Sequence, residues 1–385
     1  MTYRTTMTGS WHRPPKILEL LQKSPTGEIS AEHAQEYLDA ERAAIRDQLH
    51  PAGPTSAGLH AVSNGGQRIA GYTNYLPARF EGFSATERAG MQMPPATIQE
   101  FIDSNPALAA MLQQMSSVFS LPKITGPLQY IGAARAKQEA ADLRQLGKEE
   151  GAPSVFLPAP SPGVITIFYP NNPAVYPTHA EYVAALGREL RKEYEAILSV
   201  PDVVLQIDAP DLAMGKQTSF EWGDQFDATL PLHVDAINTA IRGLPPERIR
   251  VHYCYGNYAA SHQLDADFAK VLPEVARLKV AAIVGELANP HHEGDLLALR
   301  RYVKEHGWPN HLGFVGGVID VKTPIVETPA TVKFRLDQLA QIVGAENTWG
   351  GTDCGFETFA GVNGVTHSVA RQKLSALAEG AALAG

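Results

Sequence analysis

Five short, β-rich runs in the second half of this 385-residue chain decide its fold: VVLQID (203–208), RIRVHYC (248–254), VAAIVGE (280–286), HLGFVGGVID (311–320) and NTWGGTDC (347–354). Their last residues lie 46, 32, 34 and 34 positions apart, about one β/α unit each. Segments with helical patterning fill three of the gaps, at 265–279, 293–307 and 328–344. Apolar strands that alternate with helices predict a parallel sheet covered on both faces.

Each of the five runs ends at a polar or chemically reactive residue, in order Asp208, Cys254, Glu286, Asp320 and Cys354. A closed (β/α)8 barrel collects its active site from the C-terminal ends of many strands. An open, doubly wound sheet concentrates such residues at one switch point instead. We therefore predict an α/β fold of the (β/α)8 TIM-barrel type.

The first half is less regular and offers one strand too many. Three candidates run into Gly-containing loops, and a fourth reads as a strand or a Pro-rich loop; they lie at 3–10, 59–66, 121–127 and 154–163. With the five later runs, this makes nine candidates for eight places, so one of them is extra.

The spacing of the early strands predicts insertions over the barrel mouth. Residues 85–118 have helical patterning and are the candidate for a helical lid, and 178–200 predicts a long helix with Thr178 as its N-cap. We see no linker between domains, so 1–385 is expected to form a single barrel domain.

Composition excludes several classes of partner. Lys plus Arg number 32 against 41 Asp plus Glu, a net charge of −9, which argues against a general binder of nucleic acid or anionic membranes. No run approaches the ~18 apolar residues of a membrane span, and the N-terminus lacks the apolar core of a secretory signal. We expect a cytoplasmic protein with two reduced cysteines, and a homo-oligomer stays open.

Four residues at predicted strand ends have the chemistry of metal ligands. His252 and Cys254 are two positions apart on an extended segment, so both side chains point to one side. Glu286 and Cys354 end two other strands, and together the four form a donor set suited to zinc. The alternative is that each cysteine is a small buried hydrophobe and that Glu286 caps the next helix. The residues alone leave both interpretations open.

Seven motifs in family order give the chain a resemblance that covers nearly its whole length: TTMTGSWHRPP (5–15), TGP (125–127), LQIDAPDLAMG (205–215), HYCYGNY (252–258), GE (285–286), GGVIDVKTP (316–324) and GTDCG (351–355). The chain resembles the cobalamin-independent methionine synthase superfamily, in particular its single-barrel branch that includes epoxyalkane:coenzyme M transferase. The resemblance implies that His252, Cys254, Glu286 and Cys354 bind Zn²⁺, with Glu286 the ligand that moves when a substrate sulfur enters. It also implies sulfur alkylation, because an anionic ligand set keeps a zinc-bound thiolate nucleophilic.

Departures from the methionine synthase pattern concern the thiol. Where those enzymes hold the homocysteine ammonium with a Glu, this chain has Gly65 and Gly66, and a second family Glu is Ala209. Arg68 lies nearby in sequence and is a candidate contact for an anionic tail, with a salt bridge elsewhere as the alternative. We also expect Asp208, and Ser10 in the opening loop, to bind substrate.

Departures also concern the alkyl donor. The Trp-Ser pair on which a pterin stacks is absent after TGP, and the family's general-acid His is replaced by Lys322. An epoxide donor needs a proton for the ring-opened alkoxide, and Lys322, Tyr130 and His262 are the candidates, each otherwise an ordinary core or surface residue.

These residues favour a zinc-dependent S-alkyltransferase, in which the zinc-bound thiolate of a small, coenzyme M-like thiol attacks a small electrophile such as an epoxide. The enzymatic alternative is cobalamin-independent methyl transfer to a thiol such as homocysteine. The non-catalytic alternative is a zinc-holding or thiol-sequestering protein on the same barrel.

Overall fold

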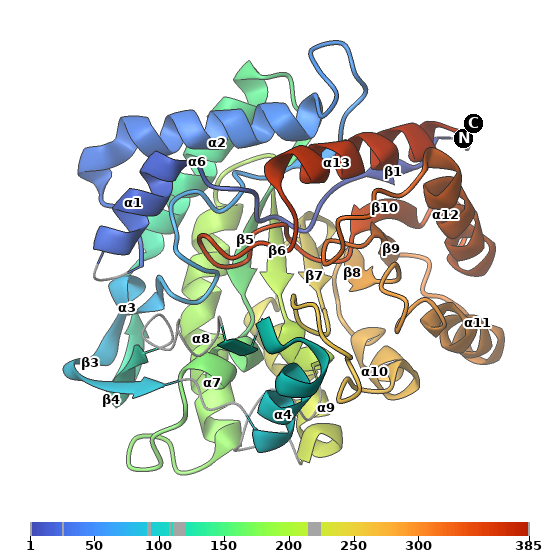
Figure 1. Ribbon diagram of the computed structural model, residues 1–385. Coiled ribbons are helices and arrows are strands. Elements are labelled where there is room, and N and C mark those ends of the chain that lie inside the picture. The colour runs from blue at the N-terminus through green and yellow to red at the C-terminus, as the bar shows by residue number, and fades with distance from the viewer. Residues whose placement is uncertain are drawn as a thin grey trace.

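The computed structural model describes residues 2–24, 27–90, 94–107, 109–110, 120–214 and 225–383. Its central element is a sheet of eight parallel strands in the order β1-β10-β9-β8-β7-β6-β5-β2 (Figure 1). A parallel bridge between Thr6 and Ala61 joins the first strand of this order to the last, and His60 N–H donates to Thr5 O at 2.9 Å. The sheet is thereby closed, which confirms the predicted (β/α)8 barrel.

All five strands predicted in the second half are present and are neighbours in the barrel. The barrel strands are β1 (Arg4–Thr5), β2 (Ala61–Val62), β5 (Ser154–Pro160), β6 (Val203–Asp208), β7 (Ile249–His252), β8 (Ala282–Glu286), β9 (Gly313–Ile319) and β10 (Thr348–Thr352). Their β-branched and aliphatic residues are buried by the barrel interior on one side and the surrounding helices on the other.

The extra candidate of the first half is 121–127. It lies in β4 (Ser120–Tyr130), which pairs antiparallel with β3 (Phe80–Gly90) in a two-stranded sheet outside the barrel. Between Lys123 and Tyr130 the side chains of β4 tend to alternate between exposed and buried, as in a strand with one solvated face. The Pro-rich segment 154–163, by contrast, supplies the barrel strand β5.

Helices surround the barrel: α1 (Pro15–Lys23), α2 (Ala34–Leu49), α3 (Leu76–Arg79), α4 (Pro95–Ser104), α6 (Ala133–Glu149), α7 (Pro162–Phe168), α8 (His179–Leu198), α9 (Phe226–Ala240), α10 (Phe268–Val275), α11 (Asp295–His306), α12 (Pro329–Val343) and α13 (His367–Ala382). The predicted long helix is α8, and Thr178 caps it in a reciprocal pair with Glu181. Among the described residues, no helix is both long and apolar enough to cross a bilayer.

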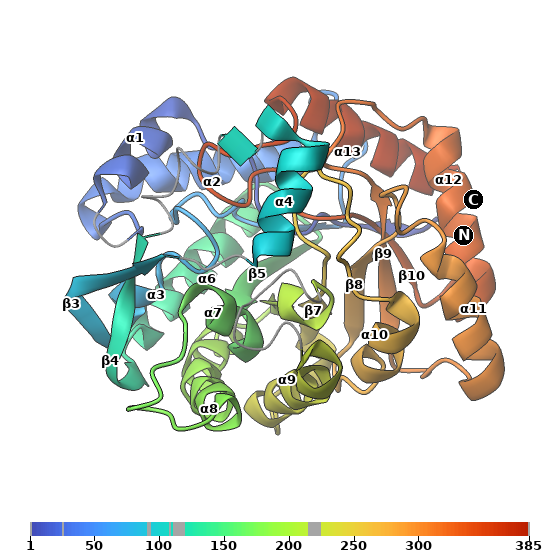
Figure 2. The same cartoon turned by 60° about the horizontal axis from the view of Figure 1, so that its bottom comes forward.

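The predicted lid segment 85–118 is only partly helical where it is described. Residues 85–90 extend β3, α4 lies at Pro95–Ser104, and 91–93, 108 and 111–119 fall outside the described residues. Glu100 of α4 accepts hydrogen bonds from Ser261 Oγ and Gln263 N, each at 2.7 Å. The helix therefore packs on the loop that follows β7 (Figure 2), and its action as a lid stays a prediction.

Candidate metal centre

An imidazole and two thiols converge at the C-terminal ends of the barrel strands. His252 is the last residue of β7, Cys254 follows two residues later, and Cys354 lies two residues beyond β10. Their ligand atoms all lie within 4.8 Å of one another, and all three residues are buried. Because β7 and β10 are not adjacent in the sheet, it is the closure and tilt of the barrel that bring these side chains together.

The His252 ring is oriented for metal binding. Its Nδ1 lies 3.3 Å from Val284 O, and because a carbonyl only accepts, we assign a proton to Nδ1, which leaves Nε2 as the nitrogen available to a metal. Nε2 is buried and has no hydrogen-bond partner among the residues that the structure describes. A ring fixed through one nitrogen, with the other left bare, is the arrangement typical of metal-ligating histidines.

The thiols are electrostatically linked. A hydrogen bond from the Cys254 thiol outweighs burial and lowers the pKa of Cys354 well below its ordinary value. The same hydrogen bond raises the pKa of Cys254. The lowered pKa of Cys354 favours the thiolate, the form in which cysteine binds metals.

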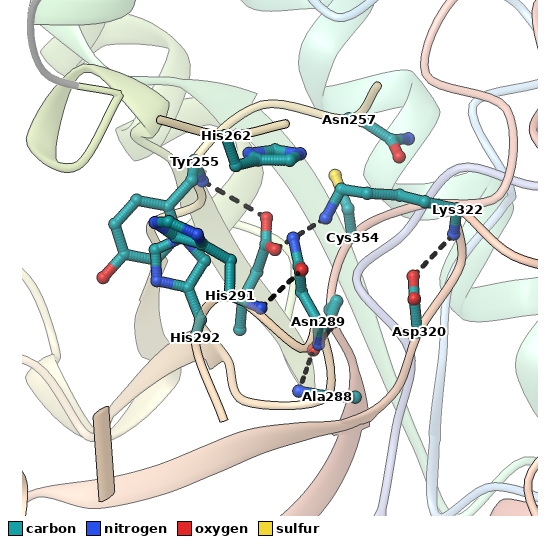
Figure 3. A network of polar contacts seen from close by, with 12 residues as sticks. Tyr255, Asn257, His262, Ala288, Asn289, His291, His292, Asp320, Lys322 and Cys354 are labelled. Carbon is teal, nitrogen blue, oxygen red and sulfur yellow. Dashed lines mark hydrogen bonds and ion pairs between the residues drawn. The ribbon is translucent and has the colours of Figure 1, made fainter. Parts of the chain in front are cut away.

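Glu286, the fourth predicted ligand, ends β8 beside this group but is not among the three residues whose ligand atoms meet. Its Oε1 accepts from Tyr255 N at 3.2 Å, and its Oε2 accepts from Lys322 Nζ at 2.6 Å. Both side chains of the ion pair are buried, at 0% and 6% exposure. Figure 3 shows the Lys322 side chain reaching from its loop toward Cys354.

Lys322 is charged in this environment. Burial lowers its pKa, but the carboxylates of Glu286, Asp353 and Asp320 together outweigh burial, and the net pKa is raised above the ordinary value of a lysine. Its backbone N–H donates to Asp320 Oδ1 at 2.8 Å, so the loop after β9 is fixed where Lys322 leaves it.

Asp353 is a residue of the site that sequence reasoning missed. Its carboxylate is fully buried and accepts three backbone N–H groups, from Leu287 and Ala288 at 3.0 Å and from Asn289 at 2.8 Å. It therefore ties the loop that follows Glu286 to the residue that precedes Cys354. The sequence signal that could have identified Asp353 was its position in the GTDCG motif, directly before Cys354.

Asp208 lies at the edge of the centre, and its binding of substrate stays a prediction. It ends β6 directly opposite His252 in the strand register, and burial raises the pKa of its carboxyl to about 6. Gln206 Nε2 donates to Asp208 Oδ1 at 2.8 Å, and Arg250 Nε donates to Gln206 Oε1 at 2.8 Å. This chain of side chains, which the sequence did not reveal, fixes the orientation of Asp208 from inside the barrel.

Ser10 also lies at the centre. Its carbonyl accepts from Phe356 N at 2.9 Å, and a Cβ added to Gly355 would lie 1.9 Å from Ser10 Oγ. The opening loop is thus packed against the residue that follows Cys354, and a side chain at position 355 would force the Ser10 hydroxyl to shift.

His262 belongs to a second, hydrogen-bonded group on the loops after β7 and β8. Its Nδ1 lies 2.8 Å from Asp265 Oδ2 and its Nε2 lies 3.0 Å from Tyr258 O. His292 bridges Asp265 and Asp295 at 2.7 and 2.9 Å; burial lowers its pKa, but the two carboxylates outweigh burial and raise it to about 9. Both ring nitrogens of His262 are engaged, so its contacts are those of a residue that stiffens these loops.

This second group is connected to the metal centre through Tyr255. The Tyr255 ring stacks on His292 with ring centroids 3.5 Å apart, and its hydroxyl donates to Asp295 at 3.1 Å. Its backbone N–H is the one that donates to Glu286.

Two predicted residues are not brought to the centre. The Arg68 guanidinium is buried and donates to Glu41 at 2.6 and 2.7 Å and to Asp142 at 2.9 Å. Its contact with an anionic substrate is therefore corrected to the salt bridge that was the alternative, because α2 and α6 place carboxylates around it.

Tyr130 lies at the end of the β3–β4 hairpin, outside the barrel. Its ring packs on Phe80 with centroids 5.1 Å apart, and its N–H donates to Glu189 at 2.7 Å. Because TGP belongs to this hairpin and not to a barrel strand, the residues after it do not reach the strand ends that carry the metal group.

The fold and the site together define a TIM-barrel protein with an imidazole–dithiol centre at the C-terminal face. Residues 161–376 match the family model described as "Cobalamin-independent synthase, Catalytic domain". This match covers more than half of the chain, so the chain belongs to that family, whose members are enzymes of the methyl- and alkyl-transferring type. The resemblance drawn from the sequence motifs is confirmed.

Relatives of two kinds match this chain. A 2-hydroxypropyl-CoM lyase from Xanthobacter autotrophicus is 25% identical over 67% of this chain and 67% of its own length. A methionine synthase from Saccharolobus islandicus is 24% identical over 98% of this chain and 93% of its own. Among solved structures, a B12-independent methionine synthase from Shewanella sp. W3-18-1 covers 100% of this chain and 98% of its own, with a TM-score of 0.68 at 20% identity. That likeness supports the fold alone.

Proposed function

We propose that this chain is a zinc-dependent S-alkyltransferase that joins the sulfur of a small thiol to a carbon of a small electrophile. The observation that carries the proposal is the bare, buried Nε2 of His252 beside the thiols of Cys254 and Cys354. One imidazole nitrogen and two sulfurs form a donor set that suits zinc, with a further position for Glu286 or a substrate. Zinc bound there would lower the pKa of an incoming thiol and keep its sulfur nucleophilic.

The charges around the centre favour a thiol with an anionic tail, such as coenzyme M. Lys322 supplies a buried ammonium within reach of Glu286. The acidic residues that would hold the ammonium of homocysteine are reduced to Asp208, with Gly65, Gly66 and Ala209 at the other positions. An anionic tail would therefore meet fewer like charges than in a site built for an amino acid.

Methyl transfer to homocysteine is the second candidate. It is favoured by the methionine synthase relatives, which align with 98% of this chain. The two candidate functions share the metal centre and differ in the group at the other end of the thiol substrate. The test is therefore which thiol the protein binds more tightly.

The test is calorimetric titration of the zinc-loaded protein with coenzyme M and, separately, with homocysteine, in two buffers that differ in ionisation enthalpy. Coenzyme M is expected to bind more tightly than homocysteine and to release about one proton per site. Cys254→Ala, treated identically, is the control and should release none.

Turnover is then followed by the loss of free thiol on addition of an epoxyalkane. Tight homocysteine binding with weak coenzyme M binding would reassign the chain to methyl transfer. Proton release that is the same in Cys254→Ala would overturn the metal centre itself.

A further inference from the structure

The Glu286 carboxylate is held by two donors that are not metals. Lys322 Nζ lies 2.6 Å from Oε2, and Tyr255 N lies 3.2 Å from Oε1. The ligand atoms of His252, Cys254 and Cys354 meet without it. The centre thus has three converging donors and a carboxylate turned toward a lysine.

We propose that Lys322 is a positioning residue that holds Glu286 away from the metal, so that the fourth coordination position stays open for the thiol substrate. This inference rests on the proposed function. It assigns Lys322 a role through Glu286 in zinc binding, in addition to its candidacy as a proton source.

The backbone is held in place at both partners of this ion pair, so the pair is a defined feature of the site. The backbone after Glu286 is fixed by Asp353, which accepts the N–H groups of residues 287–289. The backbone of Lys322 is fixed by Asp320. Only the side chain of Glu286 can rotate between the ammonium of Lys322 and the metal position. The short contact between two buried, opposite charges favours the ammonium.

The net charge of the centre explains how Lys322 would help an anionic substrate to bind. Zn²⁺ with two thiolates, a neutral imidazole and Glu286 has a net charge of about −1, and an incoming thiolate would bring it to about −2. With the Lys322 ammonium counted, the resting group is neutral and the thiolate-bound group is about −1. Lys322 thereby offsets the like-charge repulsion that an anionic substrate would otherwise meet.

The experiment is a double-mutant cycle on zinc affinity, measured by competition with a chelator. Lys322→Met removes the charge at similar length and frees Glu286, so zinc is expected to bind about tenfold more tightly, the scale at which residues behind metal ligands act. Glu286→Gln alone should leave the affinity within about twofold of the parent, whereas in the Lys322→Met background it should abolish the gain.

Two further readouts separate this role from a merely structural one. The visible absorption of the Co²⁺-substituted protein should change in Lys322→Met and return to that of the parent in Lys322→Arg, which keeps the charge. Coenzyme M should bind Lys322→Met at least about tenfold more weakly, because Glu286 must first be displaced. Circular dichroism confirms folding, and the double variant, which removes both buried charges, serves if Lys322→Met alone is unstable.

The inference is overturned if Lys322→Met raises zinc affinity equally in the parent and in the Glu286→Gln background, since the lysine would then act on the metal directly. It is also overturned if Glu286→Gln weakens zinc binding in the parent as much as in Lys322→Met. Failure of the proposed function looks different: zinc affinity would not depend on Cys254→Ala, and the inference would fall with it.

Discussion

Replacement of Asp353 by alanine tests the core of the site. The carboxylate is fully buried and accepts three backbone N–H groups; alanine leaves those of Ala288 and Asn289 without their acceptor, whereas Leu287 N–H keeps Gly317 O at 3.0 Å. Each buried donor deprived of its partner costs about 1–3 kcal/mol, so the loss in the free energy of unfolding should be at least about 2 kcal/mol. Asn keeps one acceptor oxygen, which can serve Leu287 and Ala288, and should cost only the share of the Asn289 N–H, about 1–3 kcal/mol.

The assay is urea unfolding of the metal-loaded protein, followed by far-UV circular dichroism, with zinc affinity measured alongside. Zinc binding should also weaken, because Asp353, whose carboxylate fixes the loop after Glu286, is the residue directly before Cys354. Glu305→Ala, an acid-to-alanine change on the exposed face of α11, is the control and should stay within about 0.5 kcal/mol of the parent. An Asp353→Ala protein as stable as this control would refute the conclusion that the hydrogen bonds of Asp353 stabilise the loop after Glu286.

Three further changes separate the metal centre from its surroundings. Cys254→Ala should lose bound zinc, measured by metal analysis, with an unchanged far-UV spectrum, because the centre lies at the functional face of the barrel. Arg68→Ala should cost about 3–5 kcal/mol in urea unfolding, since it leaves Glu41 buried without its cationic partner, yet leave the dissociation constant of coenzyme M unchanged. The folded-state pKa of His292, about 9, exceeds the ordinary 6.5, so its stabilisation is complete below about pH 6.5 and is lost as the pH rises through about 9. The stability difference between the parent and His292→Gln should therefore shrink by about 3 kcal/mol between pH 6 and pH 10, and a constant difference would contradict the two-carboxylate bridge.

The barrel could be predicted because its second half repeats a regular unit. β6 to β10 end at or within two residues of reactive side chains, so strand spacing and strand-end chemistry pointed to the same face. The first half gave a weaker signal, because two of its barrel strands are only two residues long, β1 and β2. The run at 121–127 was an equal candidate, and its actual partner, β3, overlaps the segment 85–118 for which the patterning predicted a helix.

The convergence of the three candidate ligands could be predicted, but not what surrounds them. His252, Cys254 and Cys354 follow from strand ends, since the backbone alone sets their positions. The contact of Lys322 with Glu286 depends on two long side chains from neighbouring strands, and rotamers are chosen by packing that a sequence does not display. Arg68 failed for the same reason: nearness in sequence to a substrate loop did not reveal the carboxylates of Glu41 and Asp142 beside it.

Lys322 also bears on the choice of alkyl donor. The resemblance places a general-acid His here in methionine synthases, where a leaving amine must be protonated. Glu286 raises the pKa of Lys322 above that of a free lysine, against the effect of burial, which makes this ammonium a poor acid toward an amine. An alkoxide is a far stronger base, comparable to hydroxide, so even a weakly acidic ammonium can protonate it. The same ion pair that positions Glu286 therefore favours a donor that leaves an alkoxide, such as an epoxide, over one that leaves an amine.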